Sequence, residues 1–169
     1  MDLYLLRDTI GFFAPVILFM FSVLLLRHMS NYLLFYIAGT ILNNILNIIL
    51  KMIIKEPRPS KDQKFIEIGV TNGAIISFDK FGMPSGHAQN CGFSLAFITL
   101  VFNNPFITTI YLIISLISIM QRYIYNNHTV LQLIIGFIIG LIAGYITYLF
   151  GSKHIMGNIK TKKDDYFYN

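Results

Sequence analysis

The sequence predicts an all-α bundle of about five membrane-spanning helices, and three observations lead to this prediction. Of the 169 residues, 55% are hydrophobic and only 12% are charged, a balance outside the range of soluble globular domains. The apolar residues form runs that approach the roughly 20 residues needed to cross a bilayer of about 30 Å. Most of the polar residues gather in one island in the middle of the chain. We therefore expect a single integral membrane domain over residues 1–169.

Two apolar runs precede the polar island. The first contains Pro15, which a membrane helix tolerates, and no small-x-small cleavage site follows it, so we interpret it as an uncleaved span. In the second run, Asn43, Asn44 and Asn47 share one helical face, which predicts either hydrogen bonds to another helix or contact with a substrate. The five expected spans are residues 9–26, 32–50, 88–102, 105–120 and 130–150.

The two runs after the island form a predicted helical hairpin. They are separated by Asn103-Asn104-Pro105, which is a strong turn signal. Each arm covers only about 25 Å at 1.5 Å per residue. The hairpin therefore either crosses a thinned region of the bilayer or ends below the headgroups.

The last run carries Gly136, Gly140 and Gly144 at four-residue intervals. Small residues at this spacing allow two membrane helices to approach closely, so we expect this helix to pack tightly against a neighbour. The residues after it, 151–169, are polar and are expected to form a solvated tail.

The polar residues fall into two islands, a loop at 51–87 and a short segment at 121–129. The hairpin between them crosses the membrane twice or re-enters it. In both cases the two islands emerge on the same face. Residues from both can therefore converge on one site.

The residue types in these islands suit a phosphoryl group. Lys51 offers a point charge, while Arg58 and Arg122 offer planar guanidinium groups that hold two phosphate oxygens at once. Ser85 and Gly86 lie where a helix begins, and the first turn of a helix presents N–H groups and a positive dipole end to an anion.

Two histidines, His87 and His128, divide the chemistry of such a site. One imidazole can attack phosphorus and the other can protonate the departing oxygen, because imidazole titrates near neutral pH. This chemistry requires no metal and no cofactor, and no acidic cluster at ligand spacing accompanies the histidines.

The composition also limits the partners. The net charge of +5 does not indicate a nucleic-acid partner, because the basic residues lie between or beside membrane segments. We expect the lipid bilayer and an anionic lipid or phosphate as partners. Cys91 is the only cysteine, so an intrachain disulfide is impossible, and the sequence predicts no particular oligomeric state.

Three motifs in this order resemble the signature of the type-2 phosphatidic acid phosphatase superfamily, which includes lipid phosphatases and vanadium haloperoxidases. They are Lys51 with Arg58-Pro59, then Pro84-Ser85-Gly86-His87, then Arg122 with His128. The resemblance implies a helical bundle with its site at the membrane edge. It also implies that His128 is the nucleophile and His87 the general acid. The phosphate ligands that it implies are Lys51, Arg58, Ser85, Gly86 and Arg122.

Two positions depart from the general pattern of that superfamily. Gln121 stands where a serine usually precedes the arginine, and Gln132 stands where an aspartate usually orients the nucleophilic histidine. A glutamine oxygen can hold one imidazole tautomer, but it brings no negative charge to stabilise an imidazolium. Glutamine at this place is a feature of the dolichyl-diphosphatase and glucose-6-phosphatase branches. Glu56-Pro57-Arg58-Pro59 and residues 82–89 most resemble dolichyl diphosphatase.

Three functions are consistent with these observations. The resemblance favours a phosphatase that hydrolyses a polyprenyl, dolichyl-type diphosphate in the endoplasmic reticulum membrane, with its site on the lumenal face. A phosphatase for phosphatidic acid or another lipid monophosphate is the first alternative. The glutamines at 121 and 132 motivate the second, a catalytically silent membrane protein that binds lipid phosphate.

Overall fold

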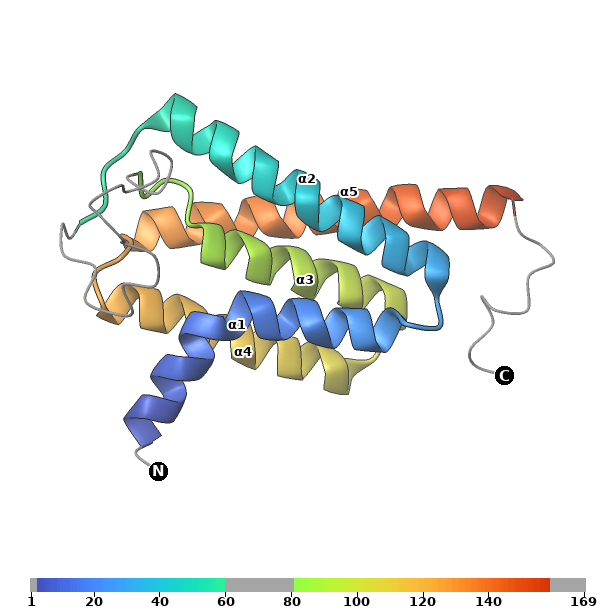
Figure 1. The fold of residues 1–169 in the computed structure, drawn as a ribbon, viewed down its shortest axis with the longest axis horizontal. Coiled ribbons are helices and arrows are strands. Elements are labelled where there is room, and N and C mark those ends of the chain that lie inside the picture. The colour runs from blue at the N-terminus through green and yellow to red at the C-terminus, as the bar shows by residue number, and fades with distance from the viewer. Residues whose placement is uncertain (1–2, 60–80, 159–169) are drawn as a thin grey trace, which may run out of the picture.

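The computed structural model describes residues 3–59 and 81–158, which contain five helices. The helices form one elongated bundle (Figure 1). The predicted all-α class is confirmed, since no strand occurs among the described residues. The helices are α1 (Leu3–Leu26), α2 (Ser30–Ile54), α3 (Gly86–Phe102), α4 (Pro105–Ile124) and α5 (Val130–Asn158).

Helix α3 is the centre of the bundle. It packs against each of the other four helices, while α1 lies beside α4 and α2 lies beside α5. The predicted hairpin is present: Asn103 ends α3 in the left-handed conformation, and the Asn104 side chain accepts hydrogen bonds from the first N–H groups of α4. Short connections of this kind place α3 and α4 antiparallel, as Figure 1 shows.

Four of the helices are long and apolar enough to cross a membrane. They span Tyr4–Leu26, Ser30–Ile54, Pro105–Ile124 and Val130–Lys153. Many of their outward side chains are large and apolar, for example Ile53, which is 70% exposed, and Phe106, which is 73% exposed, as expected for surfaces that face lipid. The chain is therefore an integral membrane protein.

Helix α3 is the shortest of the five described helices, as expected for one arm of the predicted hairpin. It has 17 residues and does not reach the length and apolarity of the other four. The reason is its central place: its buried side chains include Gln89 and Ser94, which bond to neighbouring helices and lower its apolar character.

The asparagines of α2 form hydrogen bonds to α3, so the interhelical interpretation is confirmed. Asn47 Nδ2 donates to Gln89 Oε1 at 2.7 Å, and Gln89 Nε2 donates to Asn43 Oδ1 at 2.9 Å. Asn43 Nδ2 in turn donates to Asn90 Oδ1 at 2.9 Å. Buried amides left without partners are costly in an apolar medium, so this network fixes the register of α3 on α2.

The glycines of α5 place it directly against α3, as predicted. A Cβ atom at Gly140 would lie 2.0 Å from the Gln89 carbonyl oxygen, and one at Gly144 would lie 2.5 Å from that of Phe93. At Gly136 the nearest atom is the Ser85 carbonyl oxygen, 2.6 Å away. Only glycine allows this approach, which brings the start of α3 next to the start of α5.

Three predicted boundaries need correction. Lys51 lies inside α2, whose last turns continue beyond the expected span, because a basic residue near a helix C-terminus is favourable. His87 lies inside α3 instead of the predicted loop. Helix α5 continues to Asn158, so the first part of the predicted tail is helical. Most of the loop, residues 60–80, and the tail after residue 158 lie outside the described residues.

Candidate active site

The predicted site residues gather at one end of the bundle. The end of α2, the start of α3, the end of α4 and the start of α5 meet at the left of Figure 1. The second and third motifs are separated by the hairpin of α3 and α4, which returns the chain to the end where it started. All three motifs therefore lie at the same end of the bundle.

Backbone hydrogen bonds join the segments that carry the site residues. Pro57 pairs with Phe81 in an isolated antiparallel bridge, and Gly82 N donates to Glu56 O at 2.8 Å. Ser85 N donates to Gln132 O at 3.1 Å. These bonds hold the segment after α2, the segment before α3 and the start of α5 together.

Arg58 and His128 lie in contact, although 70 residues separate them. The distance from Arg58 Nη1 to His128 Nε2 is 3.4 Å. Lys51 is 5% exposed and Arg122 is 6% exposed. The charge of Lys51 acts on His128, and the charges of Arg122 and Arg58 act on His87. Three cations and two histidines therefore lie at the same end of the bundle.

The surroundings of His128 determine its tautomer. His128 Nδ1 lies 2.9 Å from Gly82 O and 3.3 Å from Gln132 Oε1. A carbonyl oxygen only accepts, so Nδ1 carries the hydrogen and donates it. Nε2 is then the nitrogen that carries the lone pair, and it accepts a hydrogen bond from the Arg58 guanidinium at 3.4 Å.

His128 lies in the connection between α4 and α5 and is 3% exposed. Burial, together with the cations Arg58 and Lys51, lowers the pKa of His128 to about 3. The imidazole is therefore neutral at physiological pH, which is the protonation state that a nucleophile requires.

Ser85 and Gly86 lie at the N-terminus of α3, as predicted. Ser85 is the residue immediately before the helix and is fully buried. Within the described ranges, its Oγ atom has no hydrogen-bond partner. A buried hydroxyl at the positive end of a helix dipole is suited to donate to an anion.

His87 is partly buried and faces helix α1. Its Nε2 atom donates to the carbonyl oxygen of Phe12 at 3.1 Å. The Phe12 ring contacts both this histidine, with 6.0 Å between the ring centroids, and Arg122, whose guanidinium carbon is 4.9 Å from the Phe12 centroid. Phe12 therefore forms one wall of the site.

A family model for the PAP2 superfamily matches residues 32–156, which include all three motifs. The chain belongs to the PAP2 superfamily. No curated protein and no solved structure matches it. PAP2 proteins are phosphatases, and the family membership supports phosphatase activity on lipid phosphates for this chain.

Helix α1 lies before the segment matched to the PAP2 model, yet it reaches the site through a bend visible in Figure 1. Pro15 lacks the N–H that would bond the Gly11 carbonyl, and Ser118 Oγ of α4 donates to that carbonyl at 2.9 Å instead. The next carbonyl, that of Phe12, accepts from His87. The sequence showed Pro15 but gave no signal that Phe12 contacts the site.

Gln121, one of the two departures from the PAP2 pattern, packs against α1. A Cβ atom at Gly11 would lie 2.6 Å from Gln121 Cβ. The glutamine therefore lies where α1 crosses α4, and the glycine on α1 makes room for it.

Two further residues of this PAP2 site, Glu56 and Gly82, were missed as site residues. Glu56 Oε1 accepts from Gln132 Nε2 at 2.7 Å. A Cβ atom at Gly82 would lie 2.5 Å from Gln132 Oε1, so a side chain at this position would displace the Gln132 amide. Both residues stand within the segments that resemble dolichyl diphosphatase, and this was the only signal available in the sequence.

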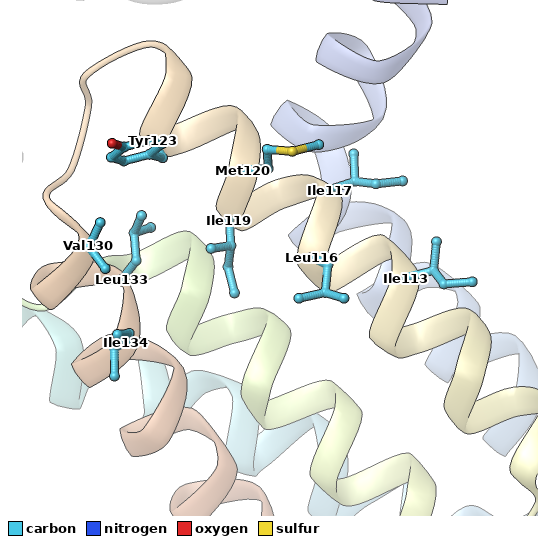
Figure 2. Close-up of a pocket in the computed structure, with 9 residues that line it drawn as sticks. All are labelled: Ile113, Leu116, Ile117, Ile119, Met120, Tyr123, Val130, Leu133 and Ile134. Carbon is cyan, nitrogen blue, oxygen red and sulfur yellow. The ribbon is translucent and has the colours of Figure 1, made fainter.

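An apolar groove of about 430 Å³ lies between α4 and α5 at this end of the PAP2 bundle. Figure 2 shows Ile119 and Leu133 in the gap between the two helices, with α3 behind them and Tyr123 near the connection that carries His128. Its other lining residues are Ile113, Leu116, Ile117, Met120, Val130 and Ile134. A second apolar hollow further along the same seam includes Leu112 and Tyr145.

Proposed function

We propose that this PAP2 protein hydrolyses a polyprenyl diphosphate of the dolichyl type to the lipid monophosphate and phosphate. The observation that carries the proposal is the contact between His128 Nε2 and Arg58 Nη1 at 3.4 Å. It places a neutral imidazole nitrogen next to a guanidinium group that can hold phosphate oxygens. A nucleophile aimed at a bound phosphoryl group is what a phospho-histidine mechanism requires.

The proposed reaction has two steps. His128 Nε2 attacks the terminal phosphorus, the P–O bond to the lipid monophosphate breaks, and His87, protonated beside the bound anionic diphosphate, gives a proton to the departing oxygen and becomes neutral. Water then attacks the phosphorus of the phospho-histidine while His87 accepts a proton from it, and the P–N bond breaks to release inorganic phosphate. Arg58, Arg122 and Lys51 would stabilise the equatorial oxygens in both transition states, and Ser85 and the N–H groups of Gly86 and His87 would add hydrogen bonds.

The apolar groove supports a lipid substrate. It begins beside the α4–α5 connection, which carries His128, with Arg122 in the last turn of α4, and apolar side chains line it. A substrate with an anionic head and an apolar tail matches the cations gathered at this end of the bundle and the apolar side chains along the groove. By the resemblance to dolichyl diphosphatase, we place the protein in the endoplasmic reticulum with a lumenal site.

Phosphate release by the purified chain tests the proposal. The native protein in detergent with a chelator present is given either a short polyprenyl diphosphate or phosphatidic acid. We expect kcat/KM to be at least about tenfold higher for the diphosphate, a difference of about 1.4 kcal/mol in transition-state binding. Preference for phosphatidic acid would assign a lipid monophosphate phosphatase instead. Folded protein that binds these lipids and releases no phosphate would be a silent binder.

A tryptophan in the groove should impair only substrates with a long tail. Ile134 is 51% exposed on the rim of the groove, so Ile134→Trp fills the groove without disturbing the core. We expect kcat/KM to fall about tenfold for a long polyprenyl diphosphate, with little change for the water-soluble p-nitrophenyl phosphate. Steady-state kinetics with both substrates measures the difference.

Ile142→Trp is the matched control. Ile142 lies two turns further along α5, is 53% exposed, and lines a different hollow between α2 and α5. Its variant should behave like the native chain. An equal loss in both variants, or a loss only in Ile142→Trp, would show that the lipid tail does not occupy the α4–α5 groove.

A further inference from the structure

The side-chain amide of Gln132 is fully buried and makes four hydrogen bonds. Its oxygen lies 3.2 Å from Thr129 N and 3.3 Å from His128 Nδ1, while its nitrogen lies 2.7 Å from Glu56 Oε1 and 3.0 Å from Pro57 O. The N–H of Thr129 can only donate and the carbonyl of Pro57 can only accept. The orientation of the amide is therefore fixed, with its oxygen toward His128 and its nitrogen toward Glu56.

Glu56 is connected to both acceptors of the His128 Nδ1 hydrogen. One acceptor is Gln132 Oε1, whose amide Glu56 holds through its side chain. The other is the Gly82 carbonyl, and Gly82 N donates to the backbone carbonyl of Glu56 at 2.8 Å. A single residue thus fixes the two groups that set the tautomer of His128.

Glu56 also supplies what Gln132 lacks. Formation of a phospho-histidine makes the imidazole more positive, and a glutamine by itself offers no negative charge to stabilise that change. The Glu56 carboxylate lies one amide away from the ring, and its charge-assisted hydrogen bond polarises the amide so that the oxygen facing His128 becomes a stronger acceptor. A carboxylate thus acts on the nucleophile through an intervening amide.

We propose that Glu56 is a positioning residue for His128 and that it acts through the Gln132 amide in place of a directly bonded carboxylate. This inference rests on the proposed function, in which His128 is the nucleophile. Glu56 does not contact the phosphate in this scheme, so its loss should affect kcat and leave KM unchanged.

The variant Glu56→Gln removes the charge and keeps an oxygen that can accept from Gln132 Nε2. We expect kcat to fall about tenfold, because a charge-assisted hydrogen bond becomes a neutral one, with KM unchanged within twofold. Lys55→Gln is the control, since Lys55 is the exposed neighbouring residue and its loss should leave both constants unchanged. Native kcat in Glu56→Gln would overturn the proposal.

Exchanging the two side chains separates charge transmission from simple structural support. In Gln132→Glu alone, two carboxylates meet where a 2.7 Å hydrogen bond stood, so kcat should fall further than in Glu56→Gln. In Glu56→Gln with Gln132→Glu, the new amide donates to the new carboxylate, which accepts from His128. The double variant should regain at least about tenfold in kcat over Gln132→Glu. Equal activity of the double variant and Gln132→Glu, with both proteins folded, would contradict the proposal.

A second readout does not depend on phosphatase activity. Diethyl pyrocarbonate modifies neutral imidazole nitrogens, and mass spectrometry locates the modified residue. The rate of modification at His128 should fall several-fold in Glu56→Gln and recover in the double variant. The rate of modification at the exposed His28 should stay constant. An inactive native chain with this pattern would disprove the proposed function and retain the role of Glu56. An unchanged His128 rate would disprove that role.

Discussion

Replacing His128 with alanine should lower phosphate release from a polyprenyl diphosphate by at least about 10³-fold, because removal of a nucleophile leaves only binding and electrostatic stabilisation. His128 Nε2 is the ring nitrogen that faces Arg58, and Nδ1 is held by Gly82 and Gln132. The substitution removes the atom that would bond to phosphorus and leaves the cations in place. Substrate binding should therefore persist while turnover is lost.

Two measurements check this expectation. Phosphate release in detergent with a chelator gives the rate, and an alkaline detergent quench after addition of a diphosphate radiolabelled in its terminal phosphate preserves the acid-labile phospho-enzyme, which should be present in the native chain and absent from His128→Ala. His28→Ala is the matched control, because His28 is exposed at the opposite end of the bundle, beside Arg27. A phospho-enzyme that forms in His128→Ala would assign the nucleophile to another residue.

The helices and the convergence of the motifs were predictable from local features of the sequence. Apolar runs mark helices because the bilayer demands them, and Asn104-Pro105 marks the turn of the hairpin. An antiparallel hairpin returns the chain to the same end, so the meeting of Arg58 and His128 followed from topology. The predicted helix ends were less accurate. Helix α2 continues through Lys51 and α5 continues to Asn158, and the residues in these last turns are too polar for hydropathy to identify them as helical.

The residues that surround the histidines could not be predicted in the same way. The contact between His87 and Phe12 joins positions 75 residues apart and depends on a backbone carbonyl exposed beside the Pro15 bend. Glu56 bonds to Gln132, which lies 76 residues away in the sequence. The residues around either position give no indication of this pairing. From the sequence, Gln132 left His128 without a nearby negative charge. The carboxylate that bonds to Gln132 belongs to Glu56, which lies in another motif.

The close packing of α3 on α5 makes Gly140 the residue whose substitution should destabilise the bundle most. In Gly140→Ala, the new methyl group would overlap the Gln89 carbonyl oxygen at 2.0 Å. The obstacle is backbone and cannot rotate away, so the two helices must separate. We expect a loss of about 3 kcal/mol in the free energy of unfolding. The separation should also move Ser85 and His87 away from His128, so that activity falls in the protein that stays folded.

Cys91 provides the measurement. It is the only cysteine and is 0% exposed in α3, so a thiol-reactive fluorophore reports the loss of packing around α3 as the protein is heated in detergent. Gly151→Ala on the same helix is the control, because its Cβ would lie 3.4 Å from the Phe35 ring, an ordinary contact, and alanine favours helix. Its midpoint should match or exceed that of the native chain, while Gly140→Ala should melt several degrees lower. An unchanged midpoint for Gly140→Ala would mean that α3 and α5 lie further apart than the structure places them, and the position of Ser85 and His87 beside His128 would lose its support.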